Sequence, residues 1–397
     1  MQPTRNLYRS ERGAIFVQVA VAVFVLMAMN VFVIDYGMMW VGRRQAQNAA
    51  DAGAIAGAVA RAYDDFDSPP TSGGVAGMSA QNVALATANE VWRQPVVPQV
   101  SFACPPGVPV TSNCVQVDVF RDAAHSNAIG TLFGPILSIT GHDVRATASA
   151  IVRSGNAVEC LRPMALADAW VENTGNTEFN RYDASGSLLS PADVYIPPSS
   201  TVSGNTTVPA DLGERIIWTL DLNPLTTPIT RNTNISVTLP TPGSVHDHIK
   251  HCSPDLIHIG QTLPLELPIP IAGDIDNALW FIINLYDPTA TWNESDHRIE
   301  NSCAPSCAPV SPRLVPVPLF DPDKFQKGRA TGDWPSVGCP SANPCITVTN
   351  IVGFFVHGTF LPYGPHGHFL RYPGQWINTA PTLVDDASWL VFPQLVR

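Results

Sequence analysis

The chain has 397 residues, which is enough for two or three domains, and a formal net charge of −11 at pH 7. Charged residues make up 14% of the chain, well below the ~25% typical of soluble domains. No basic run and no interleaving of basic with aromatic residues occurs. This composition speaks against a nucleic-acid-binding protein.

An uncharged run of 21 residues, Ala14 to Ile34, follows a short N-terminal segment that contains three arginines. A helix of about 20 apolar residues crosses a ~30 Å hydrocarbon core, so the run predicts a membrane span. A cleaved signal peptide is the alternative, but its apolar core would have about 7–15 residues and lead to a small-residue cleavage site. Here the run is longer and leads into Tyr36 and Trp40, which suit lipid headgroups. We therefore expect a permanent anchor that crosses the membrane once.

The arginines bear on orientation. Arg5, Arg9 and Arg12 favour a cytoplasmic N-terminus over residues 1–13, because basic residues collect on the cytoplasmic side. A second basic pair, Arg43 and Arg44, follows the span and reduces this asymmetry. We expect the bulk of the chain on the extracytoplasmic side.

The apolar run continues without a proline into an alanine-rich segment that ends near Tyr63. One helix over residues 14–63, half in lipid and half in water, would be roughly 75 Å long. Small residues recur in its second half at spacings of 4, 3, 4 and 3: Ala46, Ala50, Gly53, Gly57 and Ala60. This spacing places them on one helix face, where another helix can approach closely. The partner is either the protein's own soluble domain or another subunit. In both cases leucine at Gly53 and Gly57 should be harmful and alanine tolerated.

Short motifs surround and follow the span. They are Arg12-Gly13-Ala14, Asp35-Tyr36-Gly37 and the stretch Arg43-Arg44-Gln45-Ala46-Gln47-Asn48-Ala49-Ala50-Asp51-Ala52. With the apolar run between them, they resemble the N-terminal module of the Tad (tight adherence) pilus-assembly family, the TadE/TadG-like proteins, especially the TadG-like branch. Cys160-Leu161-Arg162-Pro163, followed by Trp170, is similar to the start of that family's second region.

The resemblance implies a bacterial cell-envelope protein with a pilin-like anchor that acts in assembly or anchoring of a Flp-type pilus. The implied partners are the membrane and other pilus-assembly or pilin-like subunits. One position departs from relatives that a prepilin peptidase cleaves, because the fifth residue after Gly13 is Gln18 and not a glutamate. An amide cannot supply the carboxylate that pairs with a neighbouring subunit's amino terminus, so a membrane-retained assembly subunit fits better than a major pilin.

Residues 64–155 predict a compact pilin-like α+β module. Its expected helices cover 79–92 and 127–139, and its expected strands cover 96–102, 115–120 and 143–152. In the second strand Val115, Val117 and Val119 alternate with polar residues, which is typical of a half-buried strand. The sheet would pack on the helical stalk and bury the apolar faces of both.

Residues 156–397 predict a β-rich exported domain. The strand candidates are 216–220, 235–239, 279–285, 346–356 and 388–392, and most of the 37 prolines lie beyond residue 94. Irregular spacing leaves the fold open, with a β-sandwich as one possibility. The predicted fold class is therefore α+β: a long transmembrane helix, a pilin-like module and a β-rich domain.

The eight cysteines all lie beyond the anchor, and an even number in an exported chain favours disulfides. Closeness in sequence favours three pairs, Cys104–Cys114, Cys303–Cys307 and Cys339–Cys345, which leave Cys160 and Cys252 for a fourth. Eight cysteines allow 105 pairings, so the sequence leaves the connectivity open. A zinc site is the alternative, but no C-x-x-C spacing occurs.

Two kinds of motif suggest metal chemistry. Asp183-Ala184-Ser185-Gly186-Ser187 matches the D-x-S-x-S pattern of von Willebrand A-type metal-binding domains, but no buried apolar strand precedes it, so a polar turn is the favoured interpretation. His246-Asp247-His248 and His366-Gly367-His368 would each place two imidazoles on one face if they lay on strands. No third ligand can be named, and surface or turn histidines are the simpler explanation.

No nucleophile-elbow, zincin or P-loop motif occurs, and no spacing singles out a catalytic triad. The favoured function is a non-enzymatic, membrane-anchored envelope subunit of a Tad/Flp-type pilus assembly system, without a cofactor and in the inner membrane. The alternative is a membrane-anchored exported enzyme or metal-dependent binding protein that uses the β-rich region. Metal analysis of the purified exported region, with His246 and His248 mutated, would separate the two.

Overall fold

The computed structural model describes residues 11–64, 69–92, 97–108, 113–202, 204, 206, 210–220, 223–267, 272–304, 306–308, 310–360, 364–384 and 387–396. Most of the predicted cytoplasmic segment, residues 1–10, therefore lies outside the described residues. Contacts divide the chain into two units, each described here by itself. Unit 1 comprises Met1–Arg61, Asp67–Ile151 and Gln394–Arg397, and unit 2 comprises Ala62–Phe66 and Val152–Pro393.

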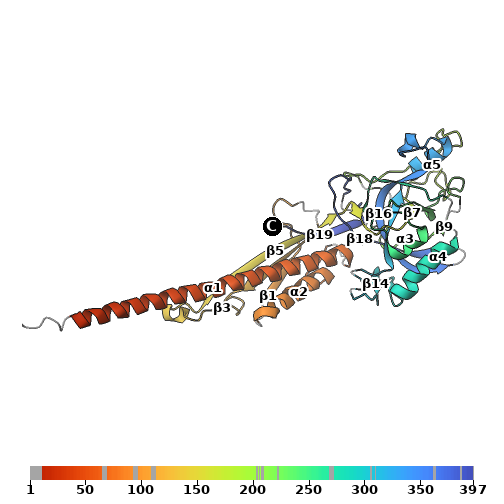
Figure 1. Ribbon diagram of the computed structural model, residues 1–397. Coiled ribbons are helices and arrows are strands. Elements are labelled where there is room, and N and C mark those ends of the chain that lie inside the picture. The colour runs from red at the N-terminus through yellow and green to blue at the C-terminus, as the bar shows by residue number, and fades with distance from the viewer. Residues whose placement is uncertain are drawn as a thin grey trace, which may run out of the picture. The chain divides into compact units, whose positions relative to one another are not determined.

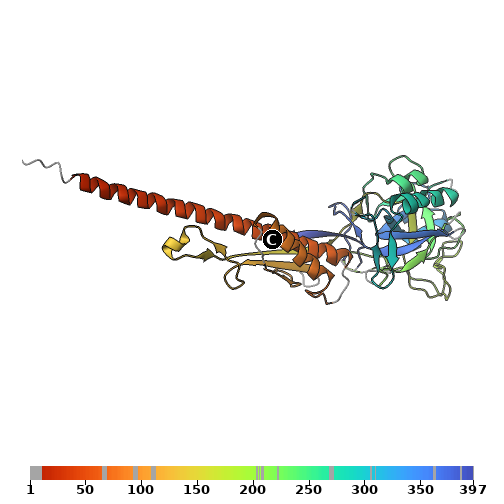
Figure 2. The same ribbon diagram turned by 90° about the horizontal axis from the view of Figure 1, so that it is seen from below.

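The N-terminal helix α1 (Glu11–Tyr63) is one uninterrupted element of 53 residues, as expected from a segment without proline. A second helix, α2 (Val75–Trp92), lies alongside the C-terminal half of α1, as Figures 1 and 2 show. Its start, after the Gly-Gly turn at 73–74, lies four residues earlier than the sequence predicted. The N-terminal half of α1 extends beyond α2 (Figure 2).

The sheet of unit 1 is antiparallel and contains β1 (Val97–Ser101), β2 (Cys114–Arg121) and β5 (Val144–Ser154), in that order. β19 (Leu390–Val396), whose last residues belong to unit 1, is the next strand after β5. Val115, Val117 and Val119 are fully buried, as the alternating pattern predicted. The sheet covers the small-residue side of α1, because Val115 and Val117 lie against Gly57 and Gly53.

The helix predicted over residues 127–139 is wrong. This segment forms a two-stranded hairpin of β3 (Ile129–Gly130) and β4 (Gly141–His142), with a single 3-10 turn, η2 (Gly134–Leu137), between them. Gly130 and Gly134 disfavour a helix, and Pro135 lacks the N–H that an interior turn needs. Pro135 is instead accommodated in the first turn of η2.

Unit 2 is built on an eight-stranded mixed sheet with the order β8-β17-β16-β15-β7-β10-β9, in which β12 also pairs with β16. Its strands are β7 (Met164–Ala167), β8 (Arg215–Ile217), β9 (Thr219–Leu220), β10 (Thr233–Ser236), β12 (Thr262–Pro264), β15 (Leu314–Phe320), β16 (Cys345–Phe360) and β17 (Gly364–Leu370). Two short pairs accompany it: β6 (Ala157–Val158) with β11 (Ile257–His258), and β13 (Thr291–Asn293) with β14 (Arg298–Glu300). β18 (Tyr372–Pro373) pairs in parallel with β19 and is the last strand of the order β1-β2-β5-β19-β18. The predicted α+β class with a β-rich C-terminal region is confirmed.

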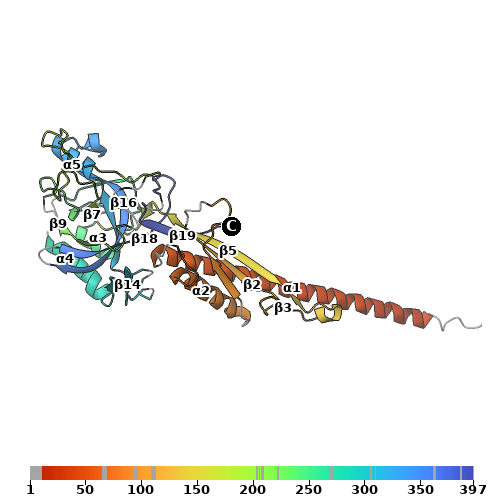
Figure 3. The same ribbon diagram turned by 180° about the vertical axis from the view of Figure 1, so that it is seen from behind.

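Both faces of this sheet are covered, so all four residues of β7 are buried. Met164 and Leu166 point into a core that contains Ile249 of α3 (Val245–His251) and Leu279 of α4 (Ala272–Phe281). The alternate residues of β7 join a second core that contains Phe325 of α5 (Pro322–Thr331) and Val337 of η4 (Pro335–Val337). Figures 1 and 3 show β7 and β16 between α4 and α5. A strand covered on both faces reads as a continuous apolar run and not as an alternating one.

The strand predicted over residues 279–285 is wrong, because this segment continues α4 as the π-helical turn η3 (Ile282–Tyr286). The buried residues here are Ile275, Ala278, Leu279 and Ile282, at spacings of 3, 1 and 3. That spacing belongs to a helix, but it becomes visible only when the window begins before residue 279. Short apolar runs do not distinguish a strand from a buried helix.

Candidate functional site: the anchor helix and its packing

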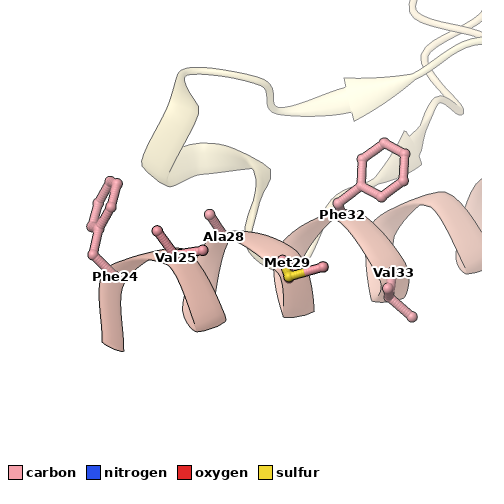
Figure 4. Close-up of a pocket in the computed structure, with 6 residues that line it drawn as sticks. All are labelled: Phe24, Val25, Ala28, Met29, Phe32 and Val33. Carbon is pink, nitrogen blue, oxygen red and sulfur yellow. The ribbon is translucent and has the colours of Figure 1, made fainter. Parts of the chain in front are cut away.

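The first half of α1 exposes apolar side chains on all sides. Phe16, Phe24 and Phe32 are 76%, 67% and 68% exposed, and none of the most apolar 18-residue window is buried. By length and composition α1 is a candidate membrane span, the one such helix among the described residues. Phe24, Val25, Ala28, Met29, Phe32 and Val33 line an open apolar hollow on its surface, drawn in Figure 4. A helix that is apolar all round requires an apolar environment such as lipid.

Aromatic and basic side chains follow the apolar run. The rings of Phe32 and Tyr36 stack with centroids 5.6 Å apart, and the guanidinium of Arg44 lies 4.0 Å from the ring centroid of Trp40. Tyr36 and Trp40 are both about half exposed. Amphipathic rings and a basic group in this order are typical of the boundary between hydrocarbon and headgroups.

Asp35 joins α1 to the hairpin between β3 and β4. Its carboxylate is 6% exposed and accepts a hydrogen bond from the N–H of Leu132 at 2.9 Å and one from the N–H of Phe133 at 3.2 Å. About two helical turns further on, Gly42 leaves room for the side chain of Ile129, with which a Cβ at position 42 would overlap. These two contacts attach the hairpin to one side of α1.

The small-residue face of α1 packs inside unit 1. All five of its residues are buried: Ala46, Ala50, Gly53, Gly57 and Ala60. A Cβ built on Gly53 would lie 2.8 Å from the carbonyl oxygen of Ala80 and 2.9 Å from the Cβ of Ala84. A Cβ on Gly57 would lie 2.6 Å from Val115 Cγ1 and 3.0 Å from Ala80 Cβ. Of the two partners that the sequence allowed, the structure therefore shows the protein's own module, through α2 and β2.

The matching face of α2 was not among the features predicted from the sequence. Ala76, Ala80, Ala84 and Ala88 recur every four residues and are all buried. Side chains four apart share a helix face, so two alanine and glycine faces meet at the α1–α2 contact. The four-residue repeat was visible in the sequence and could have predicted this partner.

The structure joins all eight cysteines in four disulfides: Cys104–Cys114, Cys160–Cys252, Cys303–Cys307 and Cys339–Cys345. These are the pairs that closeness in sequence favoured. The Cys160–Cys252 bond links residues 92 apart, with Cα atoms separated by 4.7 Å, and is the long-range covalent link of unit 2. Disulfides are typical of chains that fold in an oxidising compartment.

Asp183 organises its own turn. Its Oδ1 accepts hydrogen bonds from the Ser185 N–H at 2.8 Å, the Ser185 hydroxyl at 2.6 Å and the Ser187 N–H at 2.9 Å. These bonds, led by that of the Ser185 hydroxyl, lower the pKa of Asp183. The motif has the geometry of a polar turn, as favoured from the sequence.

The two histidine motifs have different environments. His246 and His248 lie on the short helix α3 and not on a strand, so their rings do not share a face. His248 is buried, with Nε2 3.1 Å from the carbonyl oxygen of Thr241. Ser244 caps the helix by accepting a hydrogen bond from the Asp247 N–H.

His366 and His368 do lie on one strand, β17, and a third histidine joins them. The ring of His357, on β16, lies 5.3 Å from that of His366 and 5.9 Å from that of His368, measured between centroids. Trp292 stacks on His368 at 4.3 Å. Burial lowers the pKa of all three histidines. Sequence reasoning missed His357 because only the β16–β17 register brings it close. Within the described part of the chain, no three His, Cys, Asp or Glu side chains are arranged to hold a metal ion.

Asp168 is a fully buried carboxylate in unit 2. It accepts hydrogen bonds from the hydroxyl of Tyr195 at 2.8 Å, the hydroxyl of Thr349 at 3.2 Å and the N–H of Ala169 at 2.9 Å. Burial raises its pKa to about 6, although these bonds act in the opposite direction. Because the folded state binds the proton more tightly than the unfolded chain, this group stabilises the fold at low pH. That contribution is lost as the pH rises from about 4 through 6.

Asp168→Asn should therefore change the pH dependence of stability. From pH 4 to pH 7, the free energy of unfolding of the wild type minus that of the variant should fall by about 2 kcal/mol. This follows from a pKa shift of roughly two units, a small part of which acts below pH 4. Chemical denaturation at several pH values measures this difference. Asp183→Asn is the matched control with the opposite sign, because the pKa of Asp183 is lowered and its stabilisation is lost as the pH falls. A parallel pH dependence for Asp168→Asn and wild type would contradict the prediction.

Comparison with known proteins identifies one segment. Residues 13–60 match the family described as "Putative Flp pilus-assembly TadE/G-like". Comparisons with curated proteins and with solved structures found no match. The matched range coincides with the part of α1 that contains the exposed apolar half, Asp35 and the buried small-residue face. Residues 13–60, which lie in the N-terminal helix, are thus similar to the TadE/G-like family of Flp pilus assembly.

Proposed function

We propose that this protein is a non-enzymatic, membrane-anchored envelope subunit of a Tad/Flp-type pilus assembly system. The observation that carries the proposal is the coincidence of the family match, residues 13–60, with one continuous helix that has two different surfaces. Its first half exposes apolar side chains and suits lipid, and its second half is the packed spine of an α+β module. Such a helix couples a folded module to the membrane without an intervening linker.

The proposed location is the bacterial inner membrane, with one crossing at Ala14–Ile34 and the bulk of the chain on the extracytoplasmic side. Four disulfides beyond the span support this orientation, because cytoplasmic thiols are kept reduced. The proposed partners are other pilus-assembly or pilin-like subunits. They would meet surfaces other than the small-residue face of α1, since the protein's own α2 and β2 already occupy that face.

Complementation of a deletion strain tests the function. Loss of the gene should abolish or strongly reduce surface Flp-type pili, and the full chain should restore them. A matched chain, in which a cleavable signal peptide replaces residues 1–34, should be exported and folded but should fail to restore pili. Normal piliation of the deletion strain would contradict an assembly role. Full rescue by the unanchored chain would contradict the role of the anchor.

A further inference from the structure

The hairpin loop between β3 and β4 lies beside the apolar half of α1. Gly134 and Ile139 of the loop share one open pocket with Ala28, Phe32 and Asp35 of the helix. Asp35 directly follows the uncharged run, and Ala28 lies seven residues before it, or about 10 Å along the axis. The loop therefore extends from the end of the run towards the middle of the span.

The loop has the composition of a lipid contact. Between Asp122 and Asp143 the chain contains no Asp, Glu, Lys or Arg. Leu132 is 64% exposed and Ile139 is 44% exposed, so apolar side chains face outward where a soluble loop would have polar ones. Burial of such side chains in an apolar phase is favourable, because it removes apolar surface from water.

The backbone of the loop is also suited to a site with little water. The N–H of Ile139 donates to the carbonyl of Gly134 at 2.9 Å, and the N–H of Ser138 donates to that of Pro135 at 3.1 Å. The hydroxyl of Thr131 donates to the carbonyl of Ile139 at 2.6 Å. Asp35 accepts the N–H groups of Leu132 and Phe133, and Pro135 has none to satisfy. Non-helical backbone is tolerated near hydrocarbon only when its polar groups are paired.

We propose that the loop 131–139 inserts into the lipid interface beside α1, on the side of the membrane where Asp35 lies, and that the Asp35 carboxylate holds it there. Unit 1 then contacts the bilayer at two places, which restricts the rotation and tilt of the helix relative to the membrane. We assign lipid as the partner of the loop because Ile139 lines the same pocket as Ala28 and Phe32. Lipid that surrounds these two helix residues therefore also contacts Ile139. An insertion depth of about 5–10 Å is usual for interfacial segments. The inference rests on the proposed membrane anchoring of α1.

Depth-dependent fluorescence quenching tests it in the full chain. All eight native cysteines are disulfide-bonded, so one introduced cysteine can carry an environment-sensitive dye. The positions are Leu132→Cys in the loop, Phe24→Cys in the span and Met78→Cys on the exposed side of α2. The protein is placed in phosphatidylcholine–phosphatidylglycerol vesicles that contain lipids with a nitroxide either high or low on the acyl chain. We expect the shallow nitroxide to quench position 132, the deep one to quench position 24, and neither to quench position 78.

The outcomes separate the loop from the anchor. If position 24 is quenched and position 132 is not, the anchor holds and the loop proposal is overturned. A dye at position 132 that is shielded from water but unaffected by either lipid would assign the loop to a protein partner and also overturn it. If neither is quenched, the membrane anchoring itself fails. In the Asp35→Ala background, quenching at 132 should fall while that at 24 is unchanged; equal quenching at 132 would overturn the role of Asp35.

Discussion

Gly53→Ala should lower the stability of the protein, although alanine is normally the better helix former. In an unobstructed helix this change stabilises by about 1 kcal/mol. Here the new methyl group would lie 2.8 Å from the backbone oxygen of Ala80, which cannot move without shifting α2, and 2.9 Å from the Cβ of Ala84. Overpacking of this kind costs about 1–3 kcal/mol, so we expect a net loss of roughly 1 kcal/mol. The sequence predicted that alanine would be tolerated at Gly53, whereas the contacts in the structure predict that it destabilises the protein.

Gly37→Ala is the matched control on the same helix. No atom lies within 4 Å of a Cβ built on Gly37, so only the helix-propensity gain of up to ~1 kcal/mol should appear. Pulse proteolysis of the full chain in detergent measures the free energy of unfolding of both variants and of the wild type. Opposite signs for Gly53→Ala and Gly37→Ala are expected. Stabilisation by both would mean that α1 and α2 are not in close contact. Gly53→Leu should prevent α2 from packing and give a proteolysed product.

Removal of the Cys160–Cys252 disulfide should have the largest effect among the four. A disulfide stabilises a protein by reducing the entropy of the unfolded chain, and the effect grows with the length of the closed loop. For the separation of 92 residues between Cys160 and Cys252 the expected stabilisation is about 4–5 kcal/mol. For the separation of 4 residues between Cys303 and Cys307 it is about 2 kcal/mol. Hydrogen bonds also hold the short loop that the Cys303–Cys307 disulfide closes. The buried carboxylate of Asp287 accepts hydrogen bonds from the Ser302 hydroxyl at 2.6 Å and the Cys303 N–H at 2.9 Å.

The double variants Cys160→Ala/Cys252→Ala and Cys303→Ala/Cys307→Ala form a matched pair, compared by chemical denaturation of the purified chain. The first should lose roughly 2–3 kcal/mol more than the second. Thiol alkylation and mass spectrometry of wild-type protein isolated from the envelope provide the compartment test. We expect all eight cysteines to be protected. Equal losses would contradict the entropic ranking, and mostly reduced thiols would contradict extracytoplasmic folding.

Features that depend on local pattern could be predicted from the sequence. The 21 uncharged residues before Asp35 and the absence of proline up to Tyr63 were enough to predict a single long helix. The alternation of valines with other residues over 115–120 was enough to predict β2, because buried side chains recur every two residues in a strand with one covered face. Residues 279–285 read as a strand because the exposed Trp280 and Leu285 are as apolar as the buried Leu279 and Ile282. The helical period of the buried residues therefore appears only in a window that begins before residue 279.

The sequence by itself determined the long apolar helix, the small-residue face of α1 and the preference for disulfides, because each depends on residue type and spacing along one segment. Only the tertiary structure decided what these features contact. It placed α2 and β2 against Gly53 and Gly57, His357 beside His366, and the loop at Leu132 on Asp35. The physical reason is that a helical or strand period specifies which face is apolar, whereas the partner of that face depends on how distant segments fill the same space.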